Sequence, residues 1–175
     1  MNYRQIKCFD LEMCCWDDGR EPRTGEIIEI GVASIDLVSK KIIDRSQYYV
    51  LPEKDDVSEF CTNLTGITQA KLNKQGRPIE DVLTSMNAKY GYHSIYAAWG
   101  KDDVVLRKEC LAKGLGMPFY EYFNLKSLYM INRRIKKGKI GMRKAMEING
   151  LEFEGKQHSG ADDAFNLARL ALTFM

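Results

Sequence analysis

The chain has 175 residues, of which 45% are hydrophobic and 29% charged, values typical of a globular protein that exclude a disordered or fibrous one. Its 26 lysines and arginines nearly balance its 24 aspartates and glutamates, and the formal net charge of +2 does not by itself indicate a polyanion-binding protein. The amino terminus lacks a signal-like apolar stretch and no segment approaches a membrane span, so we expect one cytoplasmic domain over residues 1–175, with no membrane contact.

The first half of the chain has the pattern of a three-stranded meander followed by helices. Strands are predicted over residues 6–12, 27–35 and 41–50, with a turn at Ser39 and Lys40. A short helix capped by Thr68 comes next. Pro78 then stands in the first turn of a longer helix, which would cross over the sheet.

The second half alternates between strands and helices. We expect a buried strand over residues 93–99, a helix over 103–113 that stops at Gly114, a short strand over 122–125 and a helix over 126–135. A last helix carries an apolar stripe that would pack on the sheet: Ala164, Leu167, Ala168, Ala171 and Leu172. These elements predict an α/β domain of ribonuclease-H-like layout, with a mixed sheet of about five strands, an antiparallel meander plus parallel strands, flanked by α-helices.

Basic residues gather in one segment of the second half. Between Lys126 and Lys144 there are eight of them and no acidic residue: Lys126, Arg133, Arg134, Lys136, Lys137, Lys139, Arg143 and Lys144. Such a segment would attract phosphates. The alternative is a solvated helix face with its loop, which is common on protein surfaces.

The five cysteines carry little chemical information. Their number is odd and none form a CxxC pair, so neither a disulfide framework nor a zinc site is indicated. We interpret them as reduced thiols in or near the core.

Asp10 and Glu12 stand two residues apart on the first predicted strand, so both side chains leave the same face, with Cα atoms roughly 7 Å apart. An Asp-x-Glu pair more often marks the solvent face of a strand. Here the apolar residues Cys8, Phe9 and Leu11 indicate a central strand, which rarely keeps two carboxylates unless something neutralises them. A divalent cation would do so.

A second acidic pair, Asp102 and Asp103, follows the apolar strand that ends at Trp99 and Gly100. Ligands in α/β proteins tend to bind in the crevice at the carboxyl ends of the strands. Alternatively, one of the two aspartates caps the following helix while the other binds metal.

The third candidate cluster lies at the start of the last helix. His158 is predicted in a loop and Asp163 in the first helical turn, so a mobile imidazole could face the reaction while the helix holds the carboxylate. The structural alternative is that Ser159 or Asp162 caps the helix. The other histidine, His93, begins a predicted strand and has no acidic neighbour.

Four carboxylates and one histidine fit a two-metal phosphodiester hydrolase. Hard oxygen ligands favour Mg²⁺ or Mn²⁺ over zinc. Two such ions can activate water and stabilise the leaving 3′ oxygen, while a neutral imidazole takes the proton of the water.

The candidate residues lie in motifs that resemble those of the DEDDh 3′-5′ exonucleases, within them the ERI-type group of RNA 3′ exonucleases and its small bacterial and viral relatives. The similar stretches are residues 9–16, 98–103 and 154–164, with further likeness at 26–31 and 60–68. The third is the most specific. The resemblance runs from about Ile6 to Phe174.

The resemblance implies that Asp10, Glu12, Asp103 and Asp163 bind two divalent cations and that His158 is the general base, with Glu12 and His158 as catalytic residues. The spacings of the family motifs select Asp103 over Asp102 and Asp163 over Asp162. The sequence departs from the usual second motif at Lys101 and Asp102, and Cys14 stands where a small hydroxyl residue is more usual.

The resemblance also suggests substrate contacts. Met13 falls where relatives contact the terminal nucleotide, His158 lies beside it, and Trp99 is placed near it. For Trp99, a core aromatic closing the strand is at least as good an interpretation.

We therefore expect a 3′-5′ exonuclease that binds RNA or single-stranded DNA 3′ ends and releases nucleoside 5′-monophosphates. One alternative is a DNA-trimming or proofreading-type exonuclease, which would use the same five residues. Another is a non-catalytic nucleic-acid-binding module that kept the fold.

Overall fold

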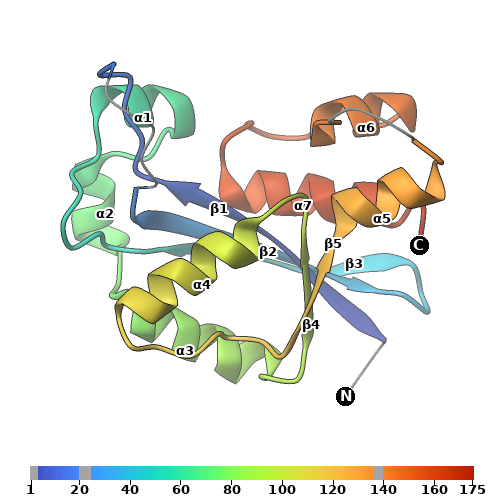
Figure 1. Ribbon diagram of the computed structural model, residues 1–175, viewed down its shortest axis with the longest axis horizontal. Helices are drawn as coiled ribbons and strands as arrows, with labels where there is room; N and C mark the ends of the chain where they lie inside the picture. The colour runs from blue at the N-terminus through green and yellow to red at the C-terminus, as the bar shows by residue number, and fades with distance from the viewer. Residues whose placement is uncertain (1–3, 20–24, 136–139) are drawn as a thin grey trace.

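A mixed five-stranded sheet forms the centre of the protein (Figure 1). The computed structural model describes residues 4–19, 25–135 and 140–175. The strands are β1 (Gln5–Met13), β2 (Ile27–Asp36), β3 (Lys41–Tyr49), β4 (Ile95–Ala98) and β5 (Glu121–Asn124), in the order β3-β2-β1-β4-β5. The first three are antiparallel, whereas β4 pairs parallel to β1 and β5 parallel to β4. The predicted meander plus parallel strands is confirmed.

Helices cover both faces of this sheet. They are α1 (Glu59–Thr65), α2 (Gln69–Gln75), α3 (Ile79–Tyr90), α4 (Asp102–Ala112), α5 (Leu125–Asn132), α6 (Met142–Ile148) and α7 (Gly160–Ala171). In Figure 1, α3 and α4 lie on one side, α7 with α5 and α6 on the other, and α1 and α2 beside the end toward which β1 points. The longest described helices have 12 residues, and none of those described is long and apolar enough to cross a membrane.

The central strand β1 is buried from both sides. Phe9 and Leu11 pack into the cluster formed with α3 and α4, whereas Ile6 and Cys8 pack into the cluster formed with α7. Because side chains alternate along a strand, the even-numbered residues that follow Cys8 also point to the α7 side. The two carboxylates of the predicted first motif therefore face α7.

Helix α7 lies unusually close to the sheet at its first turn. A Cβ atom on Gly31 of β2 would overlap the carbonyl of Gly160, so this approach needs a glycine at position 31. A Cβ atom on Gly160 would be tightly packed, 3.2 Å from the Gly31 nitrogen. Further along, the small residues Ala164, Ala168 and Ala171 are fully buried against the sheet. The close packing brings the amino end of α7 onto β2.

Several predicted boundaries need correction. The fourth strand covers 95–98 rather than 93–99, because the chain turns at Gly91 (φ +79°) and His93 lies in that turn. Helix α5 ends at Asn132 instead of residue 135, and Arg134 has the left-handed φ of 53°. Pro78 is the N-cap of α3, one residue before the helix begins.

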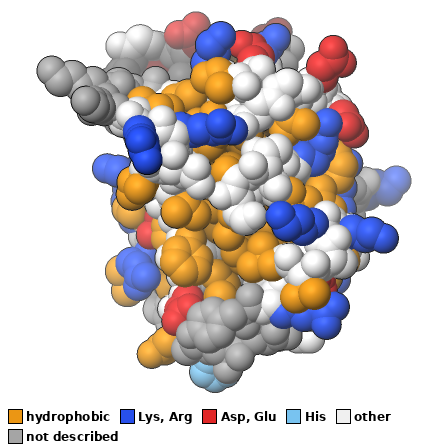
Figure 2. Space-filling model, turned by 90° about the vertical axis from the view of Figure 1, so that its right-hand side faces the viewer, with side chains coloured by type: hydrophobic (Ala, Val, Ile, Leu, Met, Phe, Trp, Pro, Cys, Tyr) orange, Lys and Arg blue, Asp and Glu red, His pale blue; other side chains and the backbone are white. Residues whose placement is uncertain are grey.

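The basic segment does not form a continuous positive surface over its described part. Arg143 and Lys144 of α6 both pair with Glu147, at 3.6 and 3.1 Å, and Arg133 donates to the Asn149 side chain. Figure 2 shows lysine and arginine side chains scattered among exposed hydrophobic ones. Ile131 of α5 is 75% exposed. Lys136, Lys137 and Lys139 lie outside the described residues.

Candidate functional site

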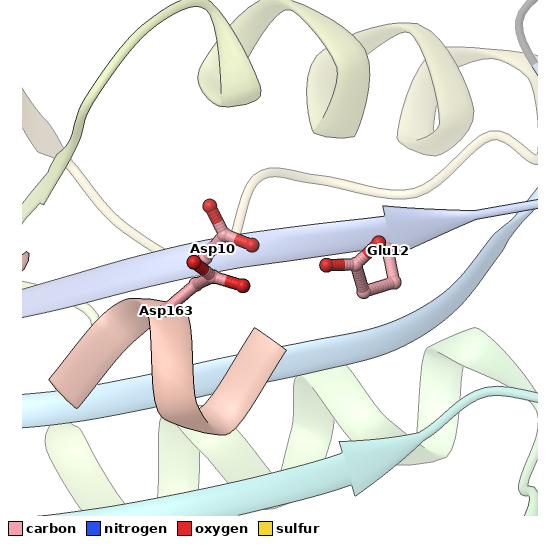
Figure 3. Close-up of side chains that lie close together, drawn as sticks. All are labelled: Asp10, Glu12 and Asp163. Atoms are coloured by element: carbon pink, nitrogen blue, oxygen red, sulfur yellow. The ribbon is translucent and has the colours of Figure 1, made fainter. Parts of the chain in front are cut away.

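Three carboxylates meet where β1 passes the first turn of α7 (Figure 3). Asp10 and Glu12 come from β1 and Asp163 from α7. One oxygen of each lies within 4.8 Å of one oxygen of the other two. Residues about 150 positions apart in the sequence thus form one compact acidic group, as the first and third motifs predicted.

These carboxylates repel one another in a poorly hydrated place. Burial, then the charges of Asp163 and Glu29, raises the pKa of Glu12 to about 8. Burial also raises the pKa of Asp163 to about 6, although two backbone N–H groups act to lower it. Burial raises the pKa of Asp10 well above its ordinary range. The protein therefore keeps three acidic groups together at a cost that a bound cation would offset.

The second acidic pair lies in the first turn of α4, and neither aspartate is the N-cap, which is Lys101. After burial, Asp102 is the strongest of the charges that raise the pKa of Asp10, and burial raises the pKa of Asp102 itself to about 6. The side chain of Asp103 lies near the Tyr122 hydroxyl, whose pKa it helps to raise. Successive helical residues point roughly 100° apart, so the two side chains face different neighbours.

Of the described residues, Asp103 is not in the close group formed by Asp10, Glu12 and Asp163. Asp102 is the member of the pair whose charge acts on that group. The assignment of Asp103 as a metal ligand stays a prediction that rests on motif spacing.

His158 lies in an exposed loop directly before α7, with the left-handed φ of 59°. The backbone N–H groups of His158 and Ser159 lie close enough to the Asp163 carboxylate to lower its pKa, so the loop adjoins the acidic group. Ser159 is the N-cap of α7 but makes no side-chain capping bond. His158 is therefore an exposed residue whose backbone lies beside the acidic group.

Two polar residues of α7 hold the preceding turn in place. The Asp162 carboxylate accepts the Lys156 backbone N–H at 2.7 Å and pairs with Arg45 of β3. Asn166, fully buried, accepts the Glu154 N–H at 3.0 Å and donates to the Glu154 carbonyl at 2.7 Å. Asp162 is thus engaged away from the acidic group, in contrast to Asp163.

The two further substrate-contact candidates have different surroundings. Met13 ends β1 next to Glu12 and is half-buried, and its carbonyl oxygen lies 3.5 Å from the Cys61 sulfur of α1. Trp99 donates its indole N–H to the Ile140 carbonyl at 3.2 Å and packs 5.6 Å from the Tyr129 ring. These contacts of Trp99 agree with the core alternative, and a substrate contact by either residue stays a prediction.

Comparison with known proteins agrees with this geometry. The sequence model of the RNase_T family, described as exonuclease, matches residues 8–171. The chain belongs to this exonuclease family. The predicted family resemblance is confirmed, and the matched range contains all five residues predicted to be catalytic or metal-binding.

The relatives and the solved structures point the same way. The chain is 32% identical over 193 residues to human ERI1 exoribonuclease 2, covering 93% of this chain but 27% of that protein. It is 30% identical to the Drosophila melanogaster 3′-5′ exonuclease Snipper, covering 96% of this chain and 68% of that protein. The nuclease domain of 3′hExo, a DEDDh family member solved bound to rAMP, superposes with a TM-score of 0.87 at 28% identity, covering 98% and 91%. The ribonuclease-H-like fold is thereby confirmed.

Two residues of this exonuclease-family site were given no role by the sequence interpretation. Glu29 is 1% exposed on β2, next to Glu12, and Asn166 is fully buried on α7. In the sequence, each is a polar residue inside an otherwise apolar pattern: Ile28-Glu29-Ile30 and Phe165-Asn166-Leu167. A polar side chain at a predicted core position was the signal that could have marked both.

Proposed function

We propose that this exonuclease-family chain hydrolyses RNA, or single-stranded DNA, from the 3′ end and releases nucleoside 5′-monophosphates. The observation that carries the proposal is the group formed by Asp10, Glu12 and Asp163, whose oxygens lie within 4.8 Å. The group combines strong mutual repulsion with burial, an arrangement that suits a centre for divalent cations.

The donor set fits two hard cations, Mg²⁺ or Mn²⁺, because every candidate ligand is a carboxylate oxygen. Asp10, Glu12 and Asp163 would hold them, with Asp103 proposed as the fourth ligand. When bound, such ions would supply activation of a water molecule and stabilisation of the leaving 3′ oxygen. Asp10 would be a ligand on which the charges of both Asp102 on α4 and Asp163 on α7 act.

His158 supplies the general base in this proposal. His158 is exposed, which leaves its imidazole accessible to water, and its backbone lies beside the Asp163 carboxylate.

RNA is the preferred substrate in this proposal because the relatives are named exoribonucleases and the 3′hExo domain binds rAMP. On this chain, Met13 lies beside Glu12 where the strand ends, and Lys156 lies close enough to lower the pKa of Glu12. An apolar side chain and a lysine beside the carboxylates suit a terminal base and a phosphate. A DNA-trimming exonuclease remains the alternative.

The test is digestion of matched 5′-labelled single-stranded RNA and DNA with Mn²⁺, Mg²⁺ or EDTA. We expect a metal-dependent ladder that shortens from the 3′ end, faster on RNA. His158→Ala should lower the rate by about 10²- to 10⁴-fold, the usual contribution of a general base.

Each outcome has a defined meaning. A ladder that is faster on DNA would favour the trimming enzyme. Measurable binding without cleavage of either strand, with every metal, would contradict the exonuclease and favour a nucleic-acid-binding module. Undiminished hydrolysis by His158→Ala would remove the general-base role from that residue.

A further inference from the structure

Glu29 is a buried carboxylate directly beside the acidic group. It lies on β2 and is 1% exposed. In the antiparallel pairing of β1 and β2, Glu29 stands opposite Glu12, so the two side chains leave the same face of the sheet. Of the described residues, Glu29 is not in the close group of three carboxylates, so its role differs from theirs.

The hydrogen bonds of Glu29 join three elements. Its Oε1 accepts the backbone N–H of Ala161, at the start of α7, at 2.9 Å. The same oxygen accepts the side-chain amide of Gln47, on β3, at 2.8 Å. Ala161 precedes Asp163 by two residues, so the bond acts on the helical turn that carries the third carboxylate.

Close packing around the bond between Ala161 and Glu29 holds the first turn of α7 near β2. Gly31 and Gly160 allow α7 to approach β2 closely, and a Cβ atom on Gly160 would lie 3.3 Å from the Glu29 carboxyl carbon. The distance between the first turn of α7 and the sheet therefore depends on Glu29, Gly31 and Gly160. That distance fixes how far Asp163 stands from Asp10.

We propose that Glu29 is a positioning residue of the metal centre: it anchors the first turn of α7 to β2 and β3, so that Asp163 stays at the separation from Asp10 and Glu12 that divalent cations require. The inference rests on the proposed function, because it concerns the same centre. Partners that orient metal-binding groups without touching the ion commonly set its affinity.

The experiment measures Mn²⁺ binding by titration calorimetry and by the thermal shift between EDTA and Mn²⁺, for wild type, Glu29→Ala and Glu29→Gln. Glu29→Ala should weaken Mn²⁺ binding about 10- to 100-fold, the usual effect of removing such a partner. Glu29→Gln keeps one carbonyl oxygen that can accept both the Ala161 N–H and the Gln47 amide, so a smaller loss is expected. Gln47→Leu should weaken binding in the same direction.

Glu26→Gln is the matched control. Glu26 directly precedes β2 and accepts backbone N–H groups of Glu53, Lys54 and Asp55, away from the acidic group. This variant should lower the unfolding temperature while leaving the Mn²⁺ affinity unchanged. A Glu29→Ala variant that binds Mn²⁺ like wild type would overturn the proposal. Should neither Glu29 variant fold, unchanged affinity in Gln47→Leu would overturn it.

Digestion assays on the same proteins separate this inference from the proposed function. Wild type that binds Mn²⁺ but hydrolyses neither RNA nor DNA would refute the exonuclease and leave the positioning role intact. Wild type that hydrolyses RNA, with Glu29 variants of unchanged metal affinity, would refute the positioning role alone.

Discussion

The fold brings together three carboxylates whose negative charges repel one another: Asp10, Glu12 and Asp163. Each has a raised pKa whose first cause is burial, and the charges of Glu12 and Asp163 also raise the pKa of Asp10. Among the causes identified for the three pKa values, backbone N–H groups oppose the rise only for Asp163. Such an arrangement is typical of a functional site rather than of a structural ion-pair network.

These shifts predict how the metal-free protein responds to pH. A carboxyl whose pKa is raised in the folded state contributes stability that is complete below its unfolded pKa and is lost as pH rises through the folded pKa. Glu12 and Asp163 have ordinary values of 4.5 and 3.8 and folded values of about 8 and about 6. In EDTA, the unfolding temperature should therefore fall as pH rises from about 5 to about 8.

Thermal unfolding followed by circular dichroism checks this prediction, with Glu12→Gln as the comparison that isolates one carboxyl. The fall should be smaller in Glu12→Gln, and Mn²⁺ should reduce it in wild type because a bound cation favours the ionised forms. An EDTA curve that is equally steep in both proteins would contradict the raised pKa of Glu12.

Among single residues, the sequence predicted the position of a side chain correctly where the local backbone alone determines it. Asp10 and Glu12 share a face because strand side chains alternate, and that needed no tertiary information. The choice between Asp102 and Asp103 depends on how α4 is rotated against the sheet, which spacing alone does not determine. Glu29 was missed because its partners, Gln47 and Ala161, come from β3 and α7.

At the scale of elements, the contact between α7 and β2 controls the site. Gly31→Ala would drive a methyl group into the Gly160 carbonyl and push the first turn of α7 off the sheet. We expect a loss of about 1 to 3 kcal/mol in the free energy of unfolding, as for other overpacked cores. Asp163 would move with the helix, so Mn²⁺ should stabilise the variant less than it stabilises wild type.

Gly116→Ala is the control for this substitution, because nothing lies within 4 Å of the added carbon. Chemical denaturation of both variants in EDTA and in Mn²⁺ provides the measurement. If Mn²⁺ stabilises Gly31→Ala as much as it stabilises wild type, the distance between α7 and the sheet does not determine Mn²⁺ binding.

Elements with strong periodicity or clear caps were predictable. The meander, α2 behind Thr68 and the apolar stripe of α7 all agree with the structure. Helices α1 and α6 were not predicted, since each has seven residues and two turns give too little pattern. The fourth strand was predicted to begin at His93, but His93 lies in the turn that follows Gly91, and β4 begins at Ile95.

At the scale of the molecule, the exonuclease family model matches residues 8–171, a range that contains the acidic group and nearly all of the sheet and helices. It spans about a quarter of the length of the human relative, 27%. Recognition of a particular RNA, the cytoplasmic location and the single-domain boundary stay predictions. The basic segment, partly paired with Glu147, is a weaker guide to RNA binding than its sequence suggested.

The central claim is that these carboxylates form a two-cation centre, and a crystal structure of the chain in Mn²⁺ with a nucleoside 5′-monophosphate tests it most directly. Anomalous scattering should show two peaks about 3.5 to 4 Å apart, bound by Asp10, Glu12 and Asp163. The ligand from α4 should be Asp103. If Asp102 binds the metal instead, only the assignment of the fourth ligand is wrong. Absence of any Mn²⁺ peak beside Asp10, with the nucleotide bound elsewhere, would contradict the account.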